Sequence, residues 1–135
     1  MRDKWDKYAL NLAETASSRS EDPFQKVGAC ALDFNYRVLS VGYNGLAAGK
    51  DVELSFWSDR DHRRKYMIHA ETNCLSLCKK GEVDILATTL LPCSYCSTMI
   101  AAYGVKNVLY KEEYDFDTEA KKIFGFYSVN LLKYS

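Results

Sequence analysis

The sequence has few prolines, no long apolar run and no segment of biased composition. Only two prolines, Pro23 and Pro92, occur among 135 residues, and no repeat, low-complexity tract or linker divides the chain. No uninterrupted apolar stretch approaches the ~18 residues that a membrane-spanning helix needs. The N-terminal segment also lacks the apolar core of a signal peptide. We therefore expect a cytosolic protein, in the cytosol of a cell or of a virus-infected host.

The chain carries no excess charge of either sign, and it has too few cysteines for a disulfide scaffold. The 18 Lys and Arg residues balance the 18 Asp and Glu residues. A protein that binds nucleic acid usually has an excess of basic residues, so the composition disfavours that function. Five cysteines are few and odd in number, which disfavours a small disulfide-bonded fold. A hydrophobic content of 47% and a length of 135 residues instead indicate one globular domain over residues 1–135.

The apolar periodicity predicts helices and strands that alternate along the chain. An opening helix (5–17) is followed by a hairpin (26–33 and 37–43). Further helices are expected at 70–80, 94–103 and 117–124, with Asp117 as an N-cap, and further strands at 83–90, 106–110 and 127–133. Because a helix separates each of the last strands, those strands should run parallel. The predicted fold class is α/β: a three-layer α/β/α sandwich with a mixed five-stranded sheet. Residues 50–67 form a long polar excursion, and such loops are often functional.

Three residues with metal-ligand chemistry stand at the starts of two predicted helices. His69 precedes one helix, and Cys93 and Cys96 begin another. Cysteines three residues apart share a face of the first turn, where the helix N-terminus favours the thiolate. A structural zinc ion usually has four protein ligands, whereas a catalytic one has three and a water molecule. The count of three therefore favours a catalytic metal.

Glu71 lies two residues after His69 and supplies a carboxylate for the same site. Zinc held by two thiolates and a neutral imidazole is formally neutral, so its bound water would need a base beside it. Glu71 could take that proton and pass it to a substrate. Two different sites would also be consistent with parts of this pattern. A redox dithiol leaves His69 and Glu71 unused, and a structural zinc knuckle lacks a fourth ligand.

The combination H-x-E and P-C-x-x-C is a known signature of zinc deaminases. The sequence resembles the cytidine deaminase superfamily and, within it, the deoxycytidylate (dCMP) deaminases. The resemblance covers about residues 22–114. Its segments are Asp22-Pro23, Val27-Gly28-Ala29, Gly42-Tyr43-Asn44-Gly45 with Gly49, His69-Ala70-Glu71-Thr72-Asn73, Pro92-Cys93 to Cys96, and 104–110. One departure is Ala47, where relatives often carry proline.

The resemblance implies a site and a reaction. His69, Cys93 and Cys96 would hold one Zn²⁺, and Glu71 would be the catalytic proton shuttle. The enzyme would be a hydrolase that removes the 4-amino group of dCMP and yields dUMP, the precursor of thymidylate, and ammonia. The substrate-binding residues implied in this way are Val27, Ala29, Asn44, Ala70, Leu91, Pro92 and Tyr110. Tyr110 could instead be an ordinary aromatic residue in a sheet.

Two further segments carry candidate roles. The basic cluster Arg60, Arg63, Arg64 and Lys65 could meet the substrate phosphate, or it could be a solvated charged face. The glycine-spaced loop with Gly42, Tyr43, Gly45 and Gly49 matches the region that holds an activator in relatives, or it is a plain turn. The resemblance implies activation by dCTP, inhibition by dTTP, Mg²⁺ accompanying an effector nucleotide, and a homo-oligomer, with a hexamer favoured.

Several different functions remain open on the sequence. A tRNA adenosine deaminase is disfavoured because the chain has no net positive charge to meet a polyanion. A free cytidine or deoxycytidine deaminase and a non-catalytic, zinc-stabilised interaction domain also stay open. His62 is a surface histidine or a ligand of a second zinc ion. Cys30, Cys74 and Cys78 are expected to be buried apolar side chains.

Overall fold

Five strands form one mixed sheet in the order β2-β1-β3-β4-β5 in the computed structural model, which describes residues 2–113 and 118–134. Antiparallel pairing joins β1 to β2 and to β3, whereas β3, β4 and β5 run parallel. The strands are β1 (Gly28–Leu32), β2 (Val38–Tyr43), β3 (Ile85–Leu90), β4 (Asn107–Glu112) and β5 (Asn130–Lys133). The predicted mixed five-stranded sheet is therefore confirmed.

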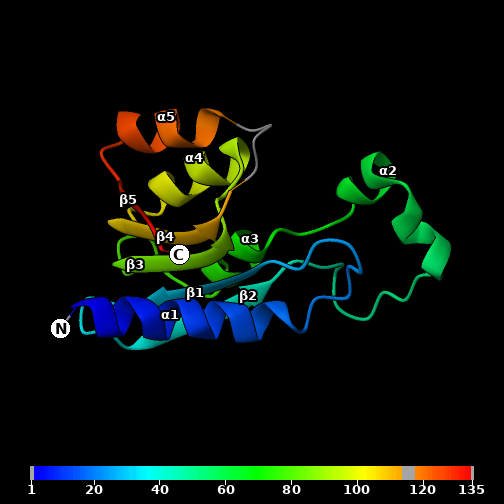
Figure 1. Ribbon diagram of the computed structural model, residues 1–135, viewed down its shortest axis with the longest axis horizontal. Helices are drawn as coiled ribbons and strands as arrows, with labels where there is room; N and C mark the ends of the chain where they lie inside the picture. The colour runs from blue at the N-terminus through cyan, green and yellow to red at the C-terminus, as the bar shows by residue number, and fades with distance from the viewer. Residues whose placement is uncertain (1, 114–117, 135) are drawn as a thin grey trace.

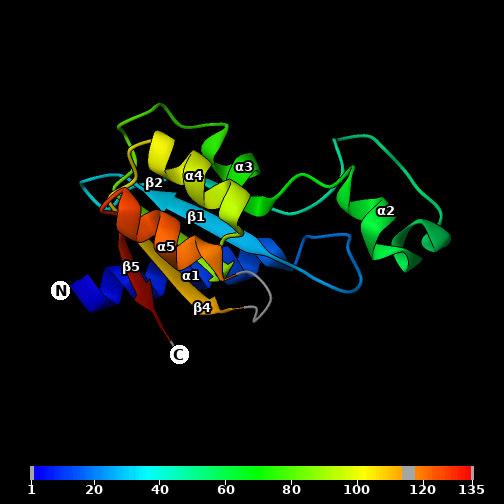
Figure 2. The same cartoon turned by 90° about the horizontal axis from the view of Figure 1, so that it is seen from above.

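Helices cover both faces of this sheet (Figure 1). On one face lies α1 (Arg2–Ser17). On the other lie the helices that follow β2, β3 and β4, namely α3 (Ala70–Leu75), α4 (Ser94–Ala102) and α5 (Glu119–Phe126). Figure 2 shows the same layers from above. The three-layer α/β/α arrangement predicted from the sequence is confirmed.

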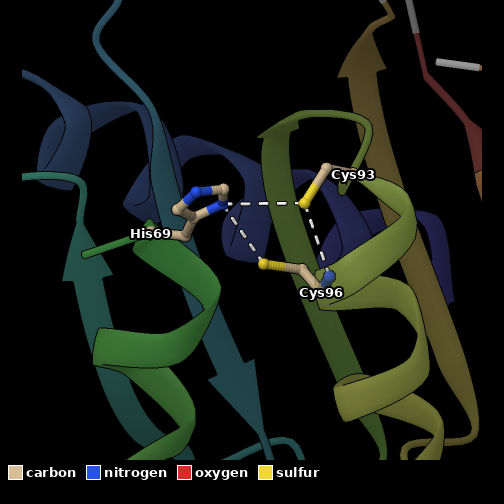
Figure 3. A group of neighbouring side chains, drawn as sticks. All are labelled: His69, Cys93 and Cys96. Atoms are coloured by element: carbon tan, nitrogen blue, oxygen red, sulfur yellow. Dashed lines mark hydrogen bonds between the residues drawn. The ribbon is translucent and has the colours of Figure 1, made fainter. Parts of the chain in front are cut away.

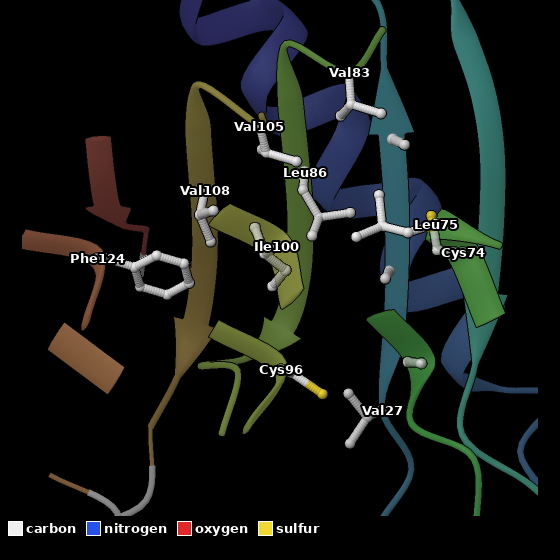
Figure 4. Packing of buried hydrophobic residues seen from close by; sticks show 13 residues of the cluster. Val27, Cys74, Leu75, Val83, Leu86, Cys96, Ile100, Val105, Val108 and Phe124 are labelled. Carbon is white, nitrogen blue, oxygen red and sulfur yellow. The ribbon is translucent and has the colours of Figure 1, made fainter. Parts of the chain in front are cut away.

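Each face of the sheet has its own apolar core, and the alternation along β3 divides its residues between them. Ile85 and Ala87 pack with α1, whereas Leu86 packs with α3, α4 and α5, as the two-residue period of a strand requires. Figure 4 shows the second core, with the sulfur of Cys96 at one end and directed towards Val27. Cys96, one of the predicted metal ligands, therefore lies at the end of this core.

The excursion contains two short helices that the sequence pattern did not predict. These are η1 (Leu54–Ser58) and α2 (Arg60–Arg64), which stand to one side of the layers (Figure 1). Helix α3 is shorter than expected because its chain tightens after Leu75 into turns, in which the N–H groups of Leu77 and Cys78 bond to carbonyls three residues back. The predicted N-cap Asp117 lies outside the described residues.

The cysteines outside the predicted metal site largely agree with the sequence expectation. Cys30 and Cys74 are fully buried, and burial raises the pKa of Cys30 to about 12, so its thiol stays protonated. Cys78 is partly buried rather than fully enclosed.

In the described part of the chain, no helix is both long and apolar enough to cross a bilayer.

Two glycines allow helices to lie directly on the strands. A Cβ atom on Gly28 would stand 1.8 Å from the carbonyl oxygen of Ala13 in α1. A Cβ atom on Gly42 would stand 2.6 Å from the backbone nitrogen of Cys74 in α3. Because both clashes are with backbone, a side chain at either position would push a helix off the sheet.

The close approach at Gly28 can be tested by substitution. Gly28→Ala is expected to lower the free energy of unfolding by about 2 kcal/mol or more, within the usual cost of overpacking a core. Gly125→Ala is the control: apart from its chain neighbours and the nearby backbone of α5, no atom of the described residues lies within 4 Å of the added Cβ. A gain in stability of about 0.5–1 kcal/mol from the better helix former is therefore expected. Urea unfolding measures both changes, and equal effects would refute the packing argument.

Candidate metal centre and active-site pocket

The N-termini of α3 and α4 carry the three predicted metal ligands. His69 is the N-cap of α3, with an extended backbone (φ −73°, ψ 152°), and its side chain does not cap the helix. Cys93 is the N-cap of α4, follows Pro92, and accepts the backbone N–H of Cys96 at 3.4 Å. The C-x-x-C spacing thus turns both sulfurs towards the imidazole that α3 presents (Figure 3).

The distances between these side chains fit a zinc ion. The Nδ1 atom of His69 lies 3.7 Å from Sγ of Cys93 and 3.3 Å from Sγ of Cys96. All three ligand atoms lie within 4.8 Å of one another. Tetrahedral zinc, with Zn–N near ~2.0 Å and Zn–S near ~2.3 Å, places a nitrogen and a sulfur ligand about 3.5 Å apart. The residues therefore fit Zn²⁺ without rearrangement of the backbone.

The pKa values of the two thiols shift in opposite directions because the sulfurs share a hydrogen bond. This bond lowers the pKa of Cys93 to about 4 and raises the pKa of Cys96. The hydrogen bond with Cys93 likewise raises the pKa of the His69 imidazole. One sulfur is thus readily a thiolate, which is the form that binds metal, and a divalent cation would favour ionisation of the other.

Glu71 is the buried acid beside this group. Its side chain is on the first turn of α3, and the residue is only 3% exposed. Burial raises the pKa of the Glu71 carboxyl to about 7, against the opposing effects of its own backbone N–H and of His69. A carboxyl group with such a pKa can both accept and donate a proton near neutral pH.

A cavity of about 550 Å³ opens onto Glu71, His69 and Cys93. Its remaining lining comes from the segment before β1, the turn after β2, the excursion and the end of β3. These residues are Asp22, Phe24, Gln25, Val27, Asn44, Arg60, Arg63, Arg64, Met67, Ala70, Leu90, Leu91 and Pro92. The cavity combines apolar walls, a buried acid and three guanidinium groups, which suits a small anionic substrate with a flat ring.

Comparison with known proteins agrees with this geometry. Residues 3–112 match the family model described as the cytidine and deoxycytidylate deaminase zinc-binding region. The chain belongs to this deaminase family. A deoxycytidylate deaminase of Mycobacterium phage D29 is 34% identical over 128 residues, covering 83% of this chain and 98% of that protein. The deoxycytidylate deaminase of Mus musculus is 28% identical over 145 residues, covering 98% of this chain and 80% of that protein.

The fold of a solved deaminase is also similar. The dCMP deaminase of cyanophage S-TIM5, in its apo form, superposes with a TM-score of 0.81 at 28% identity. The match covers 99% of this chain and 100% of that one. The parallel pairing of β4 and β5, predicted from the intervening helix, is part of the fold described above.

Several residues predicted for substrate binding line the cavity, namely Val27, Asn44, Ala70, Leu91 and Pro92. Asn44 also braces the wall: its Oδ1 accepts the N–H of Val27 at 2.9 Å, and its Nδ2 donates to the carbonyl of Gln25 at 2.8 Å. An asparagine next to a turn glycine thus has a structural function in this deaminase as well as a place at the cavity.

Three of the predicted residues lie elsewhere. Within the described chain, the cavity lining does not include Ala29, Tyr110 or Lys65. Ala29 is fully buried in β1, between β2 and β3. Tyr110 is buried in β4, packs with Leu91 and Ala120, and donates its hydroxyl to Glu113 at 2.9 Å. The ring of Tyr110 is thus enclosed by the core, and a contact of Tyr110 with substrate stays a prediction from the resemblance.

The four loop residues predicted to bind an effector are also outside the described cavity lining. Gly42 serves the contact between β2 and α3, and Gly45 forms a backbone bridge with Ile68. Tyr43 is exposed, and Gly49 adopts a φ of 85°, which favours glycine. Packing explains the glycine at position 42 and backbone conformation explains the glycine at position 49, whereas effector binding by this loop stays a prediction.

His62 does not join a second metal group. Among the residues that the structure describes, His69, Cys93 and Cys96 are the one cluster of three or more such ligands. His62 is exposed and packs edge to face with Phe56 and Tyr66. Sequence reasoning also missed Phe24, Gln25 and Met67 as lining residues, and no motif distinguishes them.

The metal assignment predicts which cysteines hold zinc. His69→Ala, Cys93→Ser and Cys96→Ser are each expected to weaken zinc binding roughly 100-fold or more. The loss of a residue that only hydrogen-bonds to a ligand weakens metal binding by about 10–100-fold, and the loss of a ligand itself should weaken it further. Cys78→Ser should retain one zinc per chain, because Cys78 lies outside the ligand cluster. Elemental analysis after dialysis measures the zinc bound per chain, and circular dichroism checks that each variant is folded. Equal zinc retention in all four variants would contradict the assignment.

Proposed function

We propose that this chain is a deoxycytidylate deaminase that hydrolyses dCMP to dUMP and ammonia. The observation that carries the proposal is a buried carboxyl, Glu71, next to a His-Cys-Cys site at a cavity with arginines in its wall. Relatives named deoxycytidylate deaminase support it. So does the S-TIM5 enzyme, which has been crystallised with dCMP and dUMP.

The chemistry follows from the arrangement of the side chains. His69, Cys93 and Cys96 would hold Zn²⁺, which supplies Lewis-acid activation of water when bound. The carboxylate of Glu71 takes a proton from the attacking water and delivers it to N3 of the cytosine ring. Glu71 then carries the second water proton to the 4-amino group, which leaves as ammonia. Both protons of the water are thereby accounted for, one on N3 of dUMP and one in ammonia.

The cavity walls would hold the substrate in place. Val27, Leu91 and Pro92 give the cavity an apolar lining against which a pyrimidine ring can pack. Asn44 holds the segment that carries Val27, so it keeps this wall in place. Exclusion of water by these walls strengthens the electrostatic contacts within the site.

Arg60 and Arg64 are the residues we propose for the substrate phosphate. Both line the cavity, and the positive charge of Arg64 opposes the rise in the pKa of the His69 imidazole, as a cation close to that ring would. Arginine is well suited to phosphate because its planar fork can donate two hydrogen bonds. Regulation by dCTP and dTTP, an accompanying Mg²⁺ and a hexameric assembly stay predictions from the resemblance.

The role of Glu71 predicts an inactive variant that keeps its metal. Glu71→Gln is expected to retain zinc and the native circular dichroism spectrum but to lose about 10²–10⁴-fold in kcat, the usual contribution of a positioned acid–base group. Glu82→Gln, in the turn before β3, is the control and should match the wild type. Spectrophotometric assay of dCMP measures turnover. Substantial activity in Glu71→Gln would exclude Glu71 as the shuttle.

The phosphate assignment predicts a difference between two substrates. Arg64→Met is expected to raise KM for dCMP roughly tenfold, because a charge-assisted hydrogen bond is lost. The same variant should leave kcat/KM for deoxycytidine nearly unchanged. Lys50→Met removes a cation outside the cavity lining and is the control. If dCMP and deoxycytidine are affected equally, Arg64 does not recognise the phosphate.

Parallel assays of cytidine and of a tRNA anticodon stem-loop test the two other deaminase activities, on free nucleosides and on tRNA, against the hydrolysis of dCMP. The proposal expects the highest kcat/KM with dCMP, because the cavity carries guanidinium groups for one phosphate and the chain has no net positive charge for a polyanion. Turnover of none of these substrates by zinc-loaded protein would point to a non-catalytic zinc domain.

A further inference from the structure

Arg63 is the arginine of the excursion that makes contacts on several sides at once. Its side chain is only 11% exposed, and its Nε lies 3.6 Å from Oδ2 of Asp22, whose side chain is 4% exposed. Its Nη1 donates to the carbonyl oxygen of Trp57 at 2.7 Å. Its guanidinium carbon stands 5.1 Å from the centre of the Phe24 ring. One guanidinium thus joins η1 in the excursion to the segment before β1.

Asp22 is held equally firmly on the opposite side of this contact. Its Oδ1 accepts the N–H groups of Phe24 at 2.8 Å and of Gln25 at 3.2 Å, which closes a turn at the rim of the cavity. The backbone N–H of Asp22 bonds to Oγ of Ser20, and that hydroxyl donates to the carbonyl of Asn44. The carboxylate is therefore fixed relative to the cavity wall before it meets Arg63.

The excursion needs such an anchor because it stands beside the three layers rather than within them. Figures 1 and 2 both show α2 to one side of the sheet. The rings of Phe56, Trp57, His62 and Tyr66 pack against one another, so the excursion has a small internal cluster. At its end, the backbone groups of Gly45 and Ile68 bond to each other. Arg63 adds the side-chain contacts to the cavity rim.

The neighbours of Arg63 in α2 would serve the substrate only if α2 is held at the rim. Arg60 and Arg64 lie three residues before and one residue after Arg63, and both line the cavity. A shift of α2 would move both guanidinium groups together. Because the Asp22–Arg63 pair is largely buried, removal of one partner leaves the remaining charge desolvated and unpaired, which is strongly unfavourable.

We propose that Asp22 and Arg63 are a positioning pair that holds α2 over the cavity, so that Arg60 and Arg64 face the phosphate of the substrate. Arg63 is then a positioning residue and not a phosphate ligand, although it belongs to the same basic cluster. This inference deepens the proposed function and rests on it. Selectivity for a phosphorylated nucleoside would then depend on the Asp22–Arg63 contact, which lies outside the reacting centre.

The test uses the zinc-loaded, full-length chain. Asp22→Asn keeps an oxygen for the turn but removes the charge that meets Arg63, and Arg63→Lys keeps the charge but not the fork that joins Asp22 to Trp57. Asp61→Asn, an equal charge change on the exposed side of α2, is the control. The two variants are expected to raise KM for dCMP roughly tenfold, equivalent to about 1.4 kcal/mol, with kcat and the kcat/KM for deoxycytidine within about twofold of wild type.

A second readout follows the excursion directly. The chain has two tryptophans, so a Trp5→Phe background leaves Trp57, which is 5% exposed, as the sole fluorescent reporter. Release of α2 should shift Trp57 emission to the red and increase its quenching by acrylamide in both variants, but not in Asp61→Asn. The double variant Asp22→Asn/Arg63→Lys should raise KM no further than the single ones, because both act through one contact.

The outcomes separate this inference from the proposed function. Unchanged KM for dCMP and unchanged Trp57 fluorescence, in an enzyme that hydrolyses dCMP, would overturn the positioning pair and leave the function standing. Equal losses with dCMP and deoxycytidine would also overturn it, since a general structural defect would not distinguish the substrates. No hydrolysis of dCMP by the wild type would overturn the proposed function and, with it, the phosphate role of α2. If Asp22→Asn does not fold, the conservative Arg63→Lys decides the question alone.

Discussion

A carboxyl group buried beside an imidazole and two sulfurs is the arrangement on which the proposed chemistry of this protein rests. Burial of Glu71 disfavours its charged form and raises the pKa of its carboxyl to about 7, against the opposing effect of His69. Near neutral pH the buried group can therefore be protonated or charged. A pKa in this range allows Glu71 to release and recover a proton, as the proposed hydrolytic deamination requires.

The fold provides this arrangement by bringing two helix N-termini to one end of the sheet. Gly42 lets α3 lie directly on β2, so His69 and Glu71 take their positions from backbone contact rather than from flexible side chains. Cys93 accepts the amide of Cys96, so the ligand pair of α4 is organised by the same bond that caps its helix. The ligands therefore stand at suitable distances in the folded chain itself.

The groups proposed for the chemistry and those proposed for recognition of the phosphate are located in different parts of the molecule. The reacting groups stand on elements that pack into the layered core, whereas the guanidinium groups come from α2, in an excursion outside the layers. Such a division allows the excursion to change without disturbing the metal site. It also makes the contact between Asp22 and Arg63 important, because it joins the two parts at the rim of the cavity.

Sequence patterns alone were enough to predict the main elements of this protein and the side chains that the fold brings together at the candidate metal centre. Periodicity and spacing act over a few residues, so they were sufficient for the strands, the major helices, the metal ligands and Glu71. The partners of Tyr110 and the different contacts of Arg60, Arg63 and Arg64 depend on the tertiary structure. Tyr110, one of the residues predicted to bind substrate, packs with Leu91 and Ala120 outside the described cavity lining. Arg63 differs from its neighbours because Asp22, from a distant part of the chain, lies against it, and no local pattern in a five-residue helix encodes a contact of that kind.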